Sequence, residues 1–101
     1  MRILLKVTLP HDTFNAAVKD GSVGQKIKRI LDEIKPEAVY FTEFNGHRTA
    51  ILIVDMTDSS QIPALCEPFF LQFNADCESH LMMTPADLAK AGLEELGKKW
   101  S

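Results

Sequence analysis

The dipeptide Asn45-Gly46, set between two runs rich in β-branched and aromatic residues, constrains this chain more than any other feature. Both residues tolerate the positive φ angles of a two-residue type I′ turn, so strands over 38–44 and 47–56 are predicted to form a tight hairpin. The resulting register contains one pair of opposite charges, which favours it through a cross-strand ion pair. It places Phe44 opposite His47, Glu43 opposite Arg48, Phe41 opposite Ala50 and Tyr40 opposite Ile51.

Hydrophobic periodicity predicts a strand and two helices before the hairpin. Apolar residues alternate over 2–9, which is typical of a strand with one buried face. Over 12–18 the period becomes that of a helix. Ser22, followed three residues later by Gln25, fits a capping box, so a second helix is expected to begin there and to end before Pro36.

A third helix is predicted after the hairpin, capped by Asp58 or Ser59, with Pro63 in its first turn. Pro68 lies deeper and is expected to kink the helix or split it, because its ring clashes with a carbonyl one turn back. A helical stripe that must be buried consists of Ile62, Leu65, Cys66, Phe69, Phe70 and Phe73.

The last part of the chain is predicted to hold a weaker strand over 75–83 and a terminal helix. Thr84-Pro85, with Asp87 at the third helical position, indicates where that helix begins. It is expected to run to about Lys99 with Leu88 and Leu96 facing inward. No repeat, low-complexity tract or linker divides the sequence, so residues 1–101 are expected to form one domain.

The predicted order β-α-β-β-α-β, followed by a terminal helix, indicates an α+β ferredoxin-like sandwich. Right-handed crossovers place two helices on one face of a four-stranded antiparallel sheet. The residues expected to face those helices are Ile3, Leu5, Val7, Val39, Phe41, Ala50, Leu52, Val54, Cys77 and Leu81.

The opposite face of this sheet is too apolar to be open to water. Its expected members include Ala38, Tyr40, Phe44, Ile51 and Ile53. A large apolar patch on a small chain usually marks an interface, and a second copy is its simplest cover. We therefore expect a homodimer that forms through the open sheet face.

The strand pattern, the strand Ala-Ile-Leu-Ile-Val-Asp over 50–55 and the helix interrupted by Pro68 resemble small stand-alone members of the dimeric α/β-barrel superfamily. This resemblance extends over nearly the whole chain and implies the fold and the dimer. The superfamily includes cofactor-independent monooxygenases, haem-binding enzymes and isomerase-like proteins, so the resemblance does not imply one reaction.

Polar side chains are expected on the same open face, so a hollow between two such faces would have the composition of a small-molecule site. The candidate ligand-binding residues are Lys6, Tyr40, Thr42, Thr49, Glu78 and His80, with Asp55 on the same face. His80 is the candidate acid or base because it titrates near neutral pH, and Tyr40 is its candidate catalytic partner. A solvated histidine or a dimer contact is the simpler interpretation of His80.

A nucleic-acid-binding function is the alternative that Gly21-Ser22-Val23-Gly24 suggests. This segment and the helix after it resemble the G-x-x-G loop of KH domains, and Lys26, Lys28 and Arg29 follow it. The loop lacks the basic residue common between the glycines of that family, and the fourth strand and terminal helix have no counterpart there. A net charge of −3 also argues against general attraction to phosphate backbones.

We expect neither a metal nor a cofactor. His11, His47 and His80 lack the spacing of zinc motifs, and although one histidine suffices for haem, no pattern favours it. Cys66 and Cys77 are expected to be reduced, inert thiols of a cytoplasmic protein. No apolar stretch has the length of a membrane helix, so no membrane partner is expected.

These features favour a dimeric small-molecule-binding or accessory module, with catalysis left uncertain. The alternatives are an enzyme of the monooxygenase or isomerase type, with or without haem, and a KH-like nucleic-acid-binding module.

Overall fold

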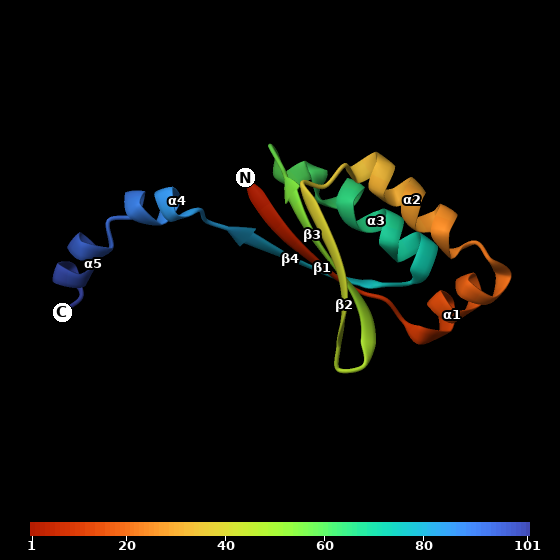
Figure 1. Ribbon diagram of the computed structural model, residues 1–101. Helices are drawn as coiled ribbons and strands as arrows, with labels where there is room; N and C mark the ends of the chain where they lie inside the picture. Colours follow the sequence, from red (N-terminus) through yellow and green to blue (C-terminus); the bar gives the residue numbers. More distant parts are fainter.

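A four-stranded antiparallel sheet carries its packed helices on one face in the computed structural model, which describes residues 1–101 (Figure 1). The strand order is β2-β3-β1-β4, the order of a ferredoxin-like sandwich. The elements are β1 (Arg2–Thr8), α1 (His11–Asp20), α2 (Val23–Ile34), β2 (Ala38–Phe44), β3 (His47–Asp55), a 3₁₀ turn η1 (Ser59–Gln61), α3 (Ile62–Phe73), β4 (Asp76–Met82), α4 (Pro85–Lys90) and α5 (Leu93–Lys99).

The core lies between the sheet and helices α1, α2 and α3. The central strands β1 and β3 contribute its sheet side, because every second residue of each is buried there: Ile3, Leu5, Val7, Ala50, Leu52 and Val54. The helices contribute Ala17, Ile30, Leu65, Cys66, Phe69 and Phe73. Val39 and Cys77 are partly buried against this cluster.

Two residues that we expected beneath the helices are exposed instead. Phe41 is 56% exposed, and Leu81 is also open to solvent. Both lie on edge strands, β2 and β4, where one side of the strand has no neighbour and the helices cover only part of the strand, as at Val39 and Cys77. The period-two pattern correctly assigned their face, but it carries no information on how far the helices extend over the edges.

The hairpin has the predicted turn and register. Asn45 and Gly46 have φ values of 53° and 78°, and the four expected pairs are all present. The expected ion pair between Glu43 and Arg48 is wrong. The Glu43 carboxylate accepts a hydrogen bond from the Gly46 N–H at 2.9 Å, and the Arg48 guanidinium donates to the Asn15 side-chain oxygen at 2.8 Å.

The expected capping box at Ser22 is also wrong. Gly21 ends α1 in the left-handed region, and the Asp20 carboxylate accepts a hydrogen bond from the Ser22 N–H at 2.8 Å. The Ser22 side chain makes no cap bond to α2. The acidic residue two positions earlier therefore organises this junction, and its interaction with the side chain and the N–H of Ser22 lowers the pKa of Asp20.

Helix α3 begins after a capping box formed by Asp58 and Gln61, and it continues through Pro68 as one helix. Burial of Leu65, Cys66 and Phe69 on both sides of the proline holds the two turns against the sheet. Of the two outcomes expected at Pro68, a kink or a split, the split is therefore wrong, and the kink stays a prediction. Two of the six stripe residues, Ile62 and Phe70, are partly exposed, so the buried stripe is narrower than expected.

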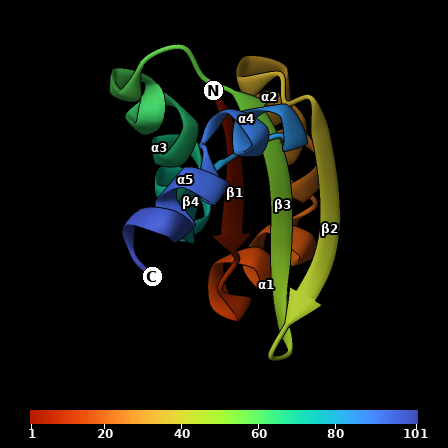
Figure 2. The same ribbon diagram turned by 90° about the vertical axis from the view of Figure 1, so that its left-hand side faces the viewer.

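The C-terminal segment 84–101, called the arm below, differs most from expectation. Thr84 and Asp87 form a capping box where the helix was predicted to begin, but Gly92, at φ 71°, separates two short helices in place of one. Leu88 and Leu96 do not face inward: both are exposed, and no residue of α4 or α5 is buried. The arm projects from the side of the sheet opposite the packed helices (Figures 1 and 2).

Candidate functional site

The open face of the sheet brings the six candidate ligand-binding residues onto one surface, arranged in rows that cross the strands. The strand registers define three rows. These are Ala38-Ile53-Leu4-His80, Tyr40-Ile51-Lys6-Glu78 and Thr42-Thr49-Thr8-Asp76. Apolar residues therefore occupy the middle of the face, and polar residues lie mainly on the edge strands.

On this face, the central strands β1 and β3 carry one charged residue away from their ends, which is Lys6. Its ammonium lies 3.5 Å from the Glu78 carboxylate and 4.4 Å from the centroid of the Phe44 ring. The ion pair and the cation–π contact hold a positive charge over the sheet. An anionic group placed over Lys6 would compete with Glu78, which is well exposed and can move away.

Tyr40 and His80 do not meet within one chain. Tyr40 lies on β2 and His80 on β4, the two opposite edges of the sheet, and their rows are adjacent. Three strand spacings separate these edges, a distance of about 14 Å. One chain therefore cannot place both side chains on a single reacting atom.

The two threonines of the candidate set differ in accessibility. They pair with each other across the hairpin, but Thr49 is buried, whereas Thr42 is exposed. The Thr49 hydroxyl donates a hydrogen bond to the His47 carbonyl oxygen at 3.0 Å. Thr42 is therefore the better placed of the two to contact a ligand.

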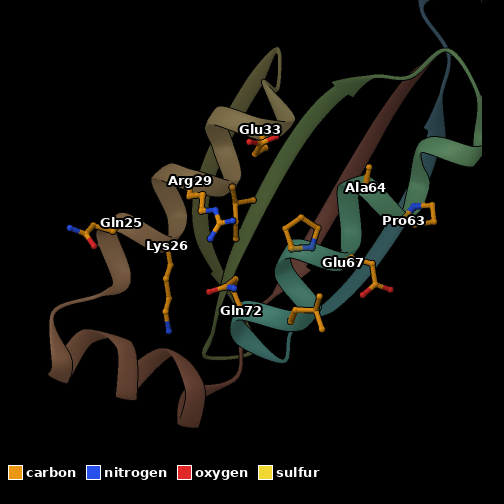
Figure 3. Close-up of a pocket in the computed structure, with 11 residues that line it drawn as sticks. Gln25, Lys26, Arg29, Glu33, Pro63, Ala64, Glu67 and Gln72 are labelled. Carbon is orange, nitrogen blue, oxygen red and sulfur yellow. The ribbon is translucent and has the colours of Figure 1, made fainter.

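The largest cavity lies elsewhere, between α2 and α3 on the outer side of the helix layer (Figure 3). It has a volume of about 520 Å³ and mixes charged and apolar groups. Its lining comprises Gln25, Lys26, Arg29, Ile30, Glu33, Pro63, Ala64, Glu67, Pro68, Leu71 and Gln72. Helical periodicity could have indicated Lys26, Arg29 and Glu33 as one face of α2, but it could not indicate which helix lies beside it.

The basic residues on which the KH-like interpretation depends, Lys26, Lys28 and Arg29, do not all line this cavity. Lys26 and Arg29 line the cavity, whereas Lys28 pairs with Asp32, with 2.6 Å between the ammonium and the carboxylate. The three cations therefore do not share one surface. A further polar cavity includes His11 and His47, whose ring centroids lie 4.7 Å apart, while His80 lies on β4.

The two cysteines are free thiols against the core. Cys66 is buried, and the Cys77 sulfur lies 4.0 Å from the Cys66 carbonyl oxygen. Burial raises the pKa of both thiols, that of Cys77 to about 12. Both therefore remain protonated near neutral pH, which is unsuitable for a nucleophile.

No protein-family model matches the chain, and no curated protein matches its sequence. None of its helices combines the length and the apolar character needed to cross a bilayer.

Proposed function

We propose that this protein is a homodimeric small-molecule-binding module of the dimeric α/β-barrel type, with its site between two open sheet faces. The apolar centre of that face supports the dimer. Leu4, Ile51 and Ile53 lie side by side on the two central strands and are partly buried, and α1, α2 and α3 pack on the other face of the sheet (Figure 1). Sheets that pack face to face lie about 10 Å apart and bury such side chains.

A second copy would also complete the polar part of the site. A two-fold axis running along the strands sets β4 of one copy opposite β2 of the other, because the axis reverses the strand order. His80 of one copy and Tyr40 of the other then lie at the same side of the interface, with Lys6 toward its middle. Apolar walls with a cation, an imidazole and a phenol suit a small molecule that has an apolar body and an acidic or hydroxyl group.

Ile51→Asp tests the dimer, with Leu71→Asp as the matched control. Leu71 is 79% exposed on α3, in the helix layer, so the control adds the same charge away from the sheet. An unpaired charge in the interface costs about 3–5 kcal/mol, which weakens dimerisation by roughly two to four orders of magnitude. Light scattering during size exclusion should show a dimer for the wild type and the control, and a monomer for Ile51→Asp.

Thermal shifts against a library of aromatic and aliphatic acids and alcohols test ligand binding. A library member present at about 100 times its dissociation constant should stabilise the dimer by about 2.7 kcal/mol. The shift should persist in Leu71→Asp and disappear in Ile51→Asp. An Ile51→Asp variant that remains dimeric, or a wild type that is monomeric at every concentration, would exclude the proposed interface.

A further inference from the structure

Within a single chain, no other surface covers and stabilises the two helices of the arm. Helices of six and seven residues are far below the roughly 12–15 residues that a helix needs to be even marginally stable in water. Leu93, Leu96 and Trp100 recur at spacings of three and four, so they form one apolar side of the segment that begins with α5. All three are exposed, Trp100 by 78%. Two short helices with an uncovered apolar side require another surface to stabilise them.

The dimensions of the chain indicate how large that surface is. The solvent-accessible area is 7057 Å², whereas a folded monomer of 11.3 kDa exposes about 5,700 Å². The radius of gyration is 17.1 Å, against about 13 Å for a compact domain of this length. The excess area of about 1,300 Å² exceeds the roughly 800 Å² that each partner buries in a stable interface.

The direction in which the arm projects indicates that its partner is a second copy of the chain. The arm leaves the end of β4 and projects from the helix-free face, the face that the proposed dimer covers (Figures 1 and 2). A second copy on that face would therefore lie beside the arm. We infer that the two arms are exchanged: each crosses the edge of the other copy and packs into the groove between α2 and β2 of that copy. This inference rests on the proposed dimer.

The receiving groove is apolar and lies at the matching edge. Its volume is about 420 Å³, and it contains the side of Phe41 that the helices leave uncovered. With the two-fold axis along the strands, β4 faces the partner's β2, and the arm leaves β4 level with Asp55. Thr49 in the groove lies six residues, about 20 Å, farther along the strand, so the arm must run along this edge to reach the groove. Its two helices together are about 20 Å long at 1.5 Å per residue, which exceeds the thickness of one sheet layer. The groove is lined by Leu9, Phe14, Gly24, Ile27, Phe41, Thr42, Arg48 and Thr49.

Charge complementarity supports the same placement. Arg48 borders the groove, its guanidinium lies 4.5 Å from the Phe14 ring centroid, and no carboxylate lies within 4 Å of it. Glu94, in the first turn of α5, likewise has no basic partner within 4 Å on its own chain. In the exchanged arrangement Trp100 is the aromatic anchor in the groove, and Glu94 approaches Arg48 of the second copy.

Trp100 is the only tryptophan of the chain, so its fluorescence reports on the arm alone. The experiment records emission and acrylamide quenching of the full chain over a dilution series, with light scattering on the same samples. We expect the emission to move to shorter wavelength and the quenching to decrease at the concentration where the dimer forms. Ile51→Asp should remove this change, and Leu71→Asp should leave it intact.

Charge exchange tests the contact itself. Arg48→Glu should weaken dimerisation at least tenfold, and Arg48→Glu combined with Glu94→Arg should recover most of that loss. Recovery requires the two residues to be close, so it separates the contact from a folding defect of Arg48→Glu. A double variant no better than Arg48→Glu alone would overturn the placement of the arm.

Two fluorescence outcomes and one light-scattering outcome would overturn the arm exchange. If Trp100 is as exposed in the dimer as in the monomer, the arm exchange is refuted, but the proposed sheet interface is not. A shift that appears with anionic phospholipid vesicles and not with protein concentration assigns the arm to a membrane. If the wild type forms no dimer at any concentration, both the arm exchange and the proposed function are refuted.

Discussion

Replacing Phe73 by alanine should remove a large part of the stability of the fold. Phe73 is 0% exposed at the end of α3, and its ring stacks on Phe14 with 5.5 Å between centroids. Truncation of a buried phenylalanine costs about 3–5 kcal/mol, and an aromatic pair contributes about 0.5–1.5 kcal/mol beyond the buried area. A chain of this length has a free energy of unfolding of about 5–15 kcal/mol, so the loss is a large part of it and reaches the limit of folding at the lower end of that range.

Phe70 provides the matched control, since it lies on the same helix and is 39% exposed. Phe70→Ala removes the same atoms from a half-open position and should cost about 1 kcal/mol, or roughly 4–8 °C in melting temperature. Phe73→Leu, which removes fewer buried atoms, should fall between the two and provides a measurable value if Phe73→Ala does not fold.

Urea unfolding followed by far-ultraviolet circular dichroism is the appropriate measurement, because Trp100 lies on the arm and does not report on the core. All variants should be compared at one protein concentration, since association contributes to apparent stability. Equal losses for Phe73→Ala and Phe70→Ala, or a loss below about 1.5 kcal/mol for Phe73→Ala, would refute the assigned buried side of α3.

Gly46→Ala should lower the free energy of unfolding by about 1–2 kcal/mol, because φ is 78° there. In the monomeric Ile51→Asp background, where no arm fills the groove beside it, Gly24→Ala within α2 should raise the free energy of unfolding by about 0.5–1 kcal/mol. Urea midpoints check both, and the same sign for the two variants would contradict the turn assignment. Burial raises the pKa of Cys77 from 9.0 to about 12. Alkylation of Cys77 by iodoacetamide at pH 8 should therefore be up to about 1,000-fold slower than in an unfolded peptide, which mass spectrometry can measure. A rate within tenfold of the peptide would show that Cys77 is not held in the core.

The proposed two-copy site changes how the pair His80 and Tyr40 should be studied. On one chain they occupy opposite sheet edges, so a variant of either residue affects two separate half-sites of the dimer. Mixed dimers that carry His80→Ala on one chain and Tyr40→Phe on the other would keep one intact site. This arrangement provides a direct means of asking whether the two residues act together.

Local features of the sequence were sufficient to predict most of the fold. Asn45-Gly46 determined the hairpin and its register, because few turns accept two consecutive positive φ angles. The alternation over 2–9 correctly identified the buried side of β1, and Thr84 with Asp87 correctly marked the start of the terminal helix. Each of these signals acts over a few residues, where backbone geometry and one buried face dominate.

Two of the errors, at Glu43 and at Ser22, arose where several local interactions compete for the same group. Glu43 could pair with Arg48 or accept the Gly46 N–H, and Ser22 could cap α2 or be held by Asp20. Sequence spacing permits both outcomes in each case. For Arg48, the outcome depends on Asn15, which lies 33 positions away in the sequence and which the fold brings beside the guanidinium.

The sequence by itself determined the order of the strands and helices, the hairpin register and the face on which each strand residue lies. Only the tertiary structure decided which of those faces is covered: Phe41 and Leu81 reach beyond the helices, and the arm with Trp100 leaves the body altogether. The physical reason is range. Turn geometry and side-chain alternation act between neighbours along the chain, whereas coverage depends on how far separate layers extend in space.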